Sequence, residues 1–382
     1  MNTYYAYLKA LNNYHTIPVV ISEYGVSTGR GMAQRDINTG RSQGHMTEQE
    51  QGQALIDCYK DIMDAGSAGS CAFTWQDEWF KRTWNTMANV DLDNTPTGAT
   101  TRPTSSIFGL LAFDPGEEES VCYADGDPSE WTAEDVVLET GGGSLSMKYD
   151  EKFIYFYAQG FDPQAETIYI PIDTTPKSGT TYCQNYGLTF QRPVDFVIRI
   201  DGEENSRVVV QKRYEVLRAM FMRETEDQDP YLDVPDLDTP EFQYIDLMLQ
   251  TATPLLTGNW ESSAEVYETG NLAAATPTPT PGTSTPWPTT CSPPTGVEIR
   301  IPWQMLNFGD PAERKIHDDY YENFGVEYTQ IDEMYVGFST AAAAGTRIRT
   351  ALFSLEGWGT DVTYHERLKE SYYMLQNLWT AA

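Results

Sequence analysis

IPVVISEYG, at residues 17–25, is a short apolar run that ends in a carboxylate, an aromatic residue and a glycine. An unbroken apolar run of this length is typical of a strand buried on both faces, as in a parallel sheet. Glu23 then stands at the end of the strand, and Gly25 frees the backbone to turn. We therefore predict a buried parallel strand here, with its partners in the surrounding sequence.

The residues on either side of this run predict alternating helices and strands. Apolar and aromatic residues recur at helical spacing over residues 4–11. Downstream, Thr47 and Glu50 form a capping box that opens a second helix. A second buried strand follows at Ser70–Trp75. This order is the repeat of an α/β barrel or of a doubly wound sheet.

The amino-acid composition of the chain changes at about residue 120. From there, short segments rich in aromatic and β-branched residues alternate with Gly, Pro, Asp and Asn. That pattern predicts an antiparallel β-sandwich. A C-terminal helix is expected from Tyr364 to Leu378. The chain therefore divides into residues 1–113 and residues 120–382.

Two stretches of the second region depart from the strand pattern. Residues 276–294 (TPTPTPGTSTPWPTTCSPP) are dominated by Pro and Thr, which predicts a disordered loop inserted in the sandwich. Residues 224–241 carry eight carboxylates among three prolines. A solvated loop is one interpretation, and calcium binding is the other, because oxygen ligands fall at short spacings.

The charge of the chain restricts its partners. Lys and Arg number 25 and Asp and Glu number 56, which gives a net charge of 25 − 56 = −31. Such a charge repels phosphate backbones and anionic lipid, so we expect no nucleic-acid partner. No apolar run approaches the roughly 18–20 residues that cross a membrane, so we expect no membrane insertion. Neutral ligands such as sugars remain candidates, and the chain is rich in aromatic residues that stack on them.

The chemistry that the sequence favours is that of carboxylates. The chain contains no GxxxxGK[ST], GxGxxG or HExxH motif, and its four His are scattered. Glu23 is well placed for a nucleophile or a general acid/base, because the carboxyl ends of barrel strands face the active site. The alternative is a Glu that pairs with a neighbouring Arg. We expect neither a metal nor an organic cofactor at this position.

The second strand ends in FTWQDEWFK, at residues 73–81. Trp75 stands where a ring can form the floor of a sugar subsite, since the C–H face of a pyranose stacks on an aromatic ring. The alternative for Trp75 is packing at the rim. Asp77 and Glu78 are candidates for binding sugar hydroxyls, with solvated surface carboxylates as the alternative.

SEYG at one strand end and FTWQDEWF at the next resemble the last two β/α units of a (β/α)8 retaining glycoside hydrolase. The resemblance implies an α+β fold in which residues 1–113 are a partial (β/α) barrel segment. It assigns Glu23 as the nucleophile and Trp75 as the subsite platform. The general acid/base of that family lies at the end of strand four, so an upstream part of the barrel is implied. Retaining hydrolysis needs two carboxyl groups about 5–5.5 Å apart, so we expect this chain alone to be inactive.

The second region resembles a family 9 carbohydrate-binding module. The resemblance rests on DGDPSEW at 125–131, on MKYDEKFIYF at 147–156, on IYIPIDT at 168–174 and on VEIRIPW at 297–303. It implies a sugar ligand held between aromatic rings and calcium as a possible structural ion. Trp131 and Trp303 are the candidate ring residues, and packing in the core is the favoured interpretation of each.

The two resemblances together predict a fragment of a secreted or cell-surface carbohydrate-active protein. Its partner is a polysaccharide or oligosaccharide, and its location is extracellular. The alternatives are a non-catalytic carbohydrate-binding module and an accessory domain that only supports the barrel.

Overall fold

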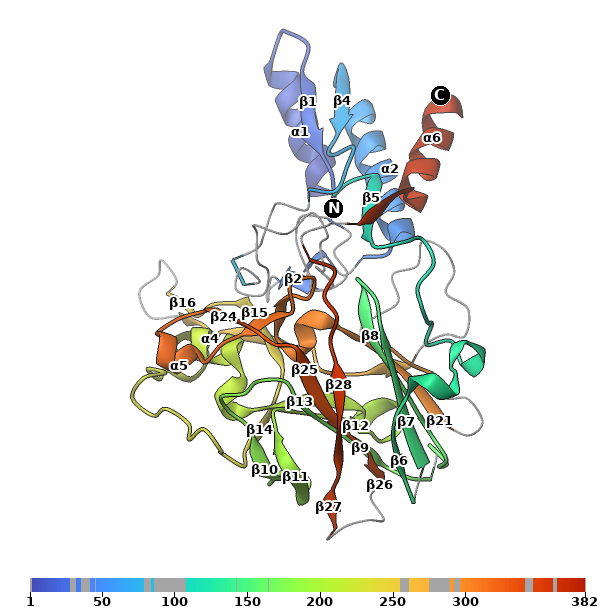
Figure 1. Ribbon diagram of the computed structural model, residues 1–382. Helices are drawn as coiled ribbons and strands as arrows, with labels where there is room; N and C mark the ends of the chain where they lie inside the picture. The colour runs from blue at the N-terminus through green and yellow to red at the C-terminus, as the bar shows by residue number, and fades with distance from the viewer. Residues whose placement is uncertain are drawn as a thin grey trace.

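Two units make up the computed structural model of the chain: a small α/β unit that holds both chain ends, and a larger unit of mostly antiparallel sheets (Figure 1). The structure describes residues 2–27, 32–35, 42–44, 46–78, 84–85, 108–141, 143–163, 165–254, 261–274, 289–291, 296–340, 346–359 and 363–381.

The α/β unit has the order of helices and strands that the sequence predicts, but its first strand is not buried on both faces. Among residues 20–24 only Tyr24 is buried, on the side where the helices pack, and Val20 is 57% exposed. The elements of the unit follow the order α1 (Thr3–Tyr14), β1 (Val20–Tyr24), α2 (Glu48–Asp64) and β4 (Gly69–Ala72). The strands β1 and β4 are parallel neighbours. The α2 helix begins at the predicted capping box, in which the Thr47 side chain accepts the backbone N–H of Glu50. Two parallel strands are not a barrel, and the described residues show no closed one.

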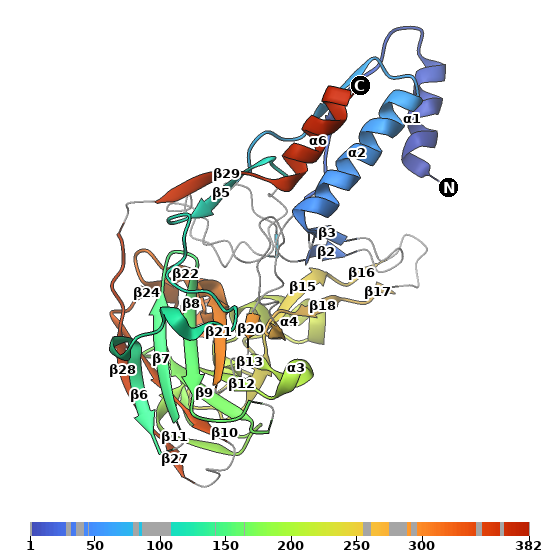
Figure 2. The same cartoon turned by 90° about the vertical axis from the view of Figure 1, so that its right-hand side faces the viewer.

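The C-terminal segment corrects the sequence prediction. Instead of one helix over 364–378, it forms a strand, β29 (Tyr364–Leu368), and then a helix, α6 (Glu370–Ala381). The strand pairs antiparallel with β5 (Leu111–Pro115). The helix lies beside α2 (Figure 2), and its Leu375 is fully buried in the core of the α/β unit, so the last residues belong with 1–113 and not with the sandwich.

The antiparallel unit is therefore inserted into the α/β unit. The chain leaves through β5, builds both large sheets, and returns through β29 before α6 completes the helix layer. The two segments that connect the units, β5 and β29, thus pair with each other as a two-stranded ribbon. This ribbon forms the junction between the units (Figure 2).

Two large sheets form the inserted unit. The first contains β6 (Val136–Thr140), β7 (Gly143–Tyr149), β8 (Phe153–Gln159), β21 (Gly296–Pro302), β20 (Thr289–Cys291) and β19 (Ala273–Ala274). The second contains β14 (Phe242–Tyr244), β13 (Arg207–Gln211), β12 (Phe196–Ile200), β9 (Ile168–Asp173), β25 (Glu333–Gly337) and β28 (Thr350–Ser354), with β26 (Ser339–Thr340) also paired to β9.

One apolar core lies between these sheets. Alternate residues of β8 and β21 meet alternate residues of β9 and β12, as the two-residue period of a strand requires. Phe156, Ile170 and Ile198, for example, are all inaccessible to solvent. This arrangement is compatible with the β-sandwich that the sequence predicts.

Shorter strands and helices lie outside the two large sheets of this inserted unit. These strands are β10 (Thr180–Cys183), β11 (Leu188–Val194), β27 (Arg347–Ile348), β15 (Asp246–Gln250), β18 (Glu265–Glu268), β16 (Thr253–Pro254), β17 (Glu261–Ser262), β22 (Phe308–Asp310), β23 (Lys315–His317) and β24 (Tyr328–Gln330). The helices are α3 (Gly202–Asn205), α4 (Val216–Glu226) and α5 (Tyr320–Asn323). The hairpin β2 (Met32–Arg35) and β3 (Ser42–Gly44) follows β1, and Arg35 forms an ion pair of 3.4 Å with Glu265 of β18.

The Pro/Thr-rich stretch at 276–294 is not wholly without regular structure. Its residues Thr289–Cys291 form β20, which pairs with β21 and β19. Adjacent β-branched residues suit a strand, and the sheet provides the partners that the local sequence lacks. The rest of the stretch lies outside the described residues. The strands on either side belong to one sheet, as predicted.

Candidate functional site

Glu23 lies near the carboxyl end of β1, and Trp75 follows the same end of the adjacent strand β4. Gly25 lets the segment after β1 lie close to the segment after β4, because a Cβ at this position would lie 2.1 Å from the Phe73 carbonyl oxygen. Gln51 of α2 fixes the strand end, since its side-chain amide donates to the Val26 carbonyl at 3.2 Å. The predicted parallel geometry at this end is therefore confirmed.

The two predicted site residues differ in what surrounds them. Glu23 is exposed, whereas the next residue, Tyr24, is buried against the helix layer. The Trp75 ring is 54% exposed and meets the ring of Tyr372 in α6 edge to face, with centroids 6.0 Å apart. Part of the Trp75 ring thus packs on the helix layer, and its role as a sugar platform stays a prediction for the exposed part.

Asp77 has a buried structural partner. Its carboxylate accepts the Lys369 ammonium at 2.7 Å and the Gly109 backbone N–H at 2.8 Å. Burial raises the pKa of Asp77 and lowers the pKa of Lys369. These contacts favour a structural role over the predicted binding of sugar hydroxyls. Glu78 is partly buried, and its predicted role is untested.

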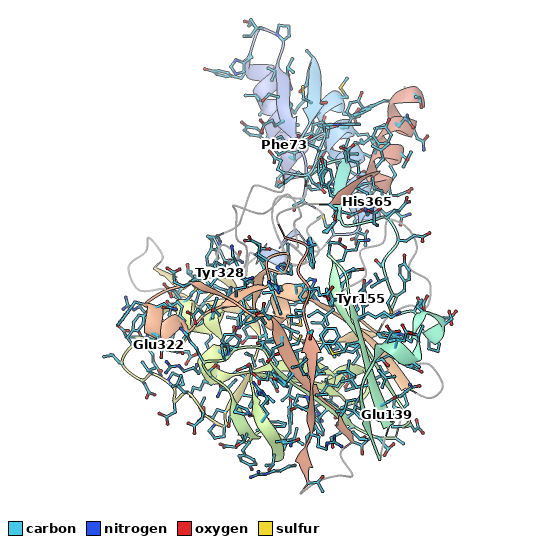
Figure 3. All side chains as sticks on the ribbon, in the orientation of Figure 1. Phe73, Glu139, Tyr155, Glu322, Tyr328 and His365 are labelled. Carbon is cyan, nitrogen blue, oxygen red and sulfur yellow. The ribbon has the colours of Figure 1, made fainter. Side chains whose placement is uncertain are left out.

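A second set of charges holds the junction together. Arg367 of β29 forms a bidentate pair with Glu48 of α2, at 2.8 and 3.1 Å, and donates to Asp114 of β5 at 2.8 Å. Nearby, His365 lies at the junction in Figure 3. Its Nδ1 is 3.0 Å from the Gly116 carbonyl oxygen. Sequence reasoning missed Arg367 and Lys369, although two basic residues in HERLK stand out in so acidic a chain.

Trp131 anchors the segment that enters the sandwich. Its indole N–H donates to a Glu298 carboxylate oxygen at 2.8 Å, and its ring stacks on Tyr157 with centroids 5.7 Å apart. Lys148 lies over the ring. The residue is partly buried, so the contacts describe an anchored ring, and sugar binding by Trp131 stays a prediction.

Trp303 is a core residue, which confirms the interpretation favoured by the sequence and excludes it as a candidate ligand ring. Its side chain is 1% exposed, and its indole N–H donates to the Asp150 carbonyl at 2.8 Å. The rings of Tyr149 and Phe308 pack against it edge to face. Almost no surface of the ring is left for a sugar, because the ring lies in the core among Tyr149, Phe308 and Trp358.

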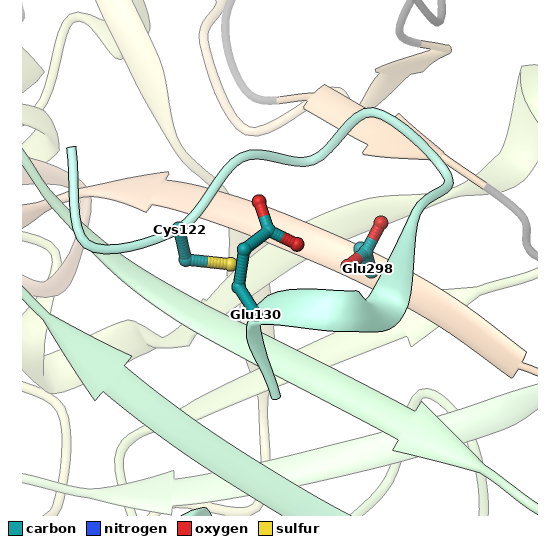
Figure 4. Close-up of side chains that lie close together, drawn as sticks. All are labelled: Cys122, Glu130 and Glu298. Carbon is teal, nitrogen blue, oxygen red and sulfur yellow. The ribbon is translucent and has the colours of Figure 1, made fainter. Parts of the chain in front are cut away.

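Figure 4 shows a mixed thiol and carboxylate cluster, which includes the Glu298 carboxylate that accepts from Trp131. The ligand atoms of Cys122, Glu130 and Glu298 lie within 4.8 Å of one another, and this is the one such group within the described ranges. These side chains could hold a cation. However, both Glu298 oxygens already accept hydrogen bonds, from Trp131 and from the Gly126 backbone N–H. Burial also raises the pKa of the Cys122 thiol, which disfavours the thiolate that a metal requires.

The acidic stretch 224–241 shows pairing rather than a gathered calcium site. Asp229 lies 2.6 Å from Arg223, and Glu241 lies 2.7 Å from Lys212. These two carboxylates therefore pair with separate basic side chains, and calcium binding by the stretch remains a prediction.

Glu298 should make stability depend on pH. Burial raises its pKa to about 7, and the carboxylates of Glu130 and Asp125 act in the same direction. Because the folded state then binds more protons, stability is greatest below the ordinary Glu pKa and falls as pH rises toward 7. In Glu298→Gln, we expect the loss of unfolding free energy between pH 5 and pH 8 to be smaller by about 1–2 kcal/mol, a figure discounted for screening by solvent.

Urea unfolding at both pH values measures this difference. Glu139→Gln, at an exposed position of β6, is the matched control and should leave the slope unchanged. Equal slopes in wild type and Glu298→Gln would contradict the assignment.

No helix in the described part of the chain has the length and apolarity to span a membrane. No protein-family model matches the chain, and neither a curated protein nor a solved structure matches it.

Proposed function

We propose that this chain is part of a retaining glycoside hydrolase, in which the α/β unit contributes the last two β/α units of a barrel and the sandwich is a carbohydrate-binding accessory domain. Glu23 is the nucleophile and Trp75 a subsite ring in this proposal. Such a protein acts on extracellular polysaccharide or oligosaccharide, at the cell surface or after secretion.

The observation that carries the proposal is the exposed carboxylate of Glu23 at the carboxyl end of a parallel strand. Trp75 follows the same end of the neighbouring strand, with a half-exposed ring. In parallel α/β sheets, this end is where substrates bind. The double displacement of a retaining glycoside hydrolase requires a carboxylate nucleophile, and an aromatic ring at the same end of the sheet can stack on a sugar.

The insertion of the sandwich also supports the proposal. The residues that follow β1 and β4 lie on the side of the α/β unit that faces the sandwich (Figure 1). An accessory domain at this place is close to the substrate end of the strands. A non-catalytic carbohydrate-binding module is the second candidate, favoured by exposed aromatic rings on the sandwich itself.

The test is an assay of two proteins on β-linked glucan, mannan and galactan. The 382-residue chain alone should release no sugar, because one carboxylate cannot perform both halves of the double displacement. The same chain preceded by the remaining β/α units should hydrolyse at least one substrate with retention of configuration. Turnover by the isolated chain, or inversion by the longer protein, would overturn the proposal.

A further inference from the structure

An exposed aromatic stack lies on the sandwich, where the loop after α4 meets α5. The Tyr231 ring is nearly parallel to that of Tyr320, at 11° with centroids 6.0 Å apart. On the ring of Tyr231 also stacks Phe324, at 30° and 5.4 Å. The Phe324 side chain is 78% exposed, so its ring is the outermost of the three. We call these three residues the Phe324 platform.

The backbone at Phe324 is in an unfavourable conformation for such a residue. Its φ is 54°, in the left-handed region, where a bulky side chain is rare and costs free energy. The other non-glycine residues with positive φ among the described residues are polar: Asp227, Asn307 and Arg314. Folding gains little from holding an apolar ring in water at a strained position. Phe324 is the C-cap of α5, where helices often adopt this conformation but with Gly or Asn in place of an apolar ring, so a phenylalanine here is unusual.

Buried charges fix the platform from below. Arg213 forms a bidentate pair with Asp319, at 2.8 and 3.0 Å, and donates to the Pro235 carbonyl at 2.7 Å. Asp319 in turn caps α5, since its side chain accepts the backbone N–H groups of Tyr321 and Glu322. One arginine thus ties the loop that carries Tyr231 to the helix that precedes Phe324. A rigid support of this kind reduces the entropy lost on binding.

The surroundings of the platform indicate the chemistry of its ligand. Lys177 forms ion pairs with Asp318 at 2.8 Å and with Glu322 at 3.6 Å, so polar groups flank the rings. A net charge of −31 disfavours anionic ligands. Rings with hydrogen-bonding neighbours suit a molecule that has apolar C–H faces and many hydroxyl groups. A neutral pyranose chain has both.

We propose that the Phe324 platform binds a neutral β-linked glycan by stacking a sugar ring on Phe324. This inference rests on the proposed carbohydrate function for its class of ligand. The platform is an accessory site, because Glu322 of α5 lies on the sandwich, away from Phe73 in the α/β unit (Figure 3). It lies partly in the 224–241 stretch, for which the sequence left a role open.

The test uses the whole 382-residue chain in affinity gels that contain hydroxyethyl cellulose, glucomannan or mixed-linkage β-glucan, with calorimetry on cellohexaose and mannohexaose. Phe324→Gly should raise the dissociation constant at least tenfold for the probe that binds. Glycine adopts positive φ without strain, so the melting temperature should be unchanged or higher. Tyr244→Ala, at a 50% exposed ring on β14, is the control and should bind as the wild type does.

Several results would overturn the proposal. If Phe324→Gly and Tyr231→Ala bind the glycan as tightly as the wild type, the platform is not the site, although the carbohydrate function stands. Wild-type chain that retains mobility in every gel also overturns the platform, and the hydrolysis assays then test the catalytic proposal separately. A melting temperature lowered by Phe324→Gly assigns the ring to packing. If the wild-type chain is a dimer and Phe324→Gly is a monomer, the ring of Phe324 serves self-association and not glycan binding.

Discussion

Replacing Glu23 with Gln in the protein that carries all the β/α units should lower kcat/KM by at least about 10³-fold, because the covalent half-reaction loses its nucleophile. The amide is close in size to the carboxylate, and Glu23 is exposed on β1, so folding should not change. Initial rates on the best β-glycan, with melting temperatures of both proteins, measure the effect.

A small external nucleophile gives a second readout of the same role. In Glu23→Ala, azide can attack the anomeric carbon in place of the carboxylate, and the product is then a glycosyl azide of inverted configuration. Glu139→Gln, exposed on β6, is the control and should retain full turnover. Unchanged turnover in Glu23→Gln would remove the nucleophile assignment and leave Glu23 a solvated strand end.

Replacing Lys369 with Met should lower the free energy of unfolding by about 3–5 kcal/mol, since it leaves Asp77 buried without its cation. The Lys369 side chain is 2% exposed and its ammonium lies 2.7 Å from Asp77. Within the described ranges, the Gly109 N–H is the donor to the carboxylate that then remains. Urea unfolding at pH 7 measures the loss, and Lys60→Met, at an exposed site on α2, should change stability by less than about 0.5 kcal/mol.

Protonation and a second substitution should each relieve this deficit. Burial already raises the pKa of Asp77, and loss of Lys369 raises it further. A raised folded-state pKa gives stability that is present at low pH and lost as pH rises, so the variant should recover part of its deficit between pH 7 and pH 5. Asp77→Asn combined with Lys369→Met should recover more than half, since Asn still accepts from Gly109. A deficit independent of both would show that packing, not charge, is responsible.

Local sequence was sufficient for α1, β1, α2 and β4 of the α/β unit. The capping box at Thr47 and the apolar run before Glu23 each depend on neighbours a few residues away, so their helix and strand could be predicted. The alternation of apolar residues likewise predicted the antiparallel sheets that meet at the core around Phe156. Trp303 could not be placed by this means, because a tryptophan after a strand looks the same whether it faces a ligand or the core.

The sequence by itself determined the order of α1, β1, α2 and β4, the parallel placement of Glu23 and Trp75, and the antiparallel character of the second unit. Only the tertiary structure decided that β29 and α6 return to the α/β unit, that Asp77 is paired with Lys369, and that Tyr231 stacks on Phe324. The physical reason is distance along the chain. Asp77 and Lys369 are separated by 292 residues. The two side chains come into contact because β5 pairs with β29, and local sequence propensity does not encode a pairing between segments so far apart.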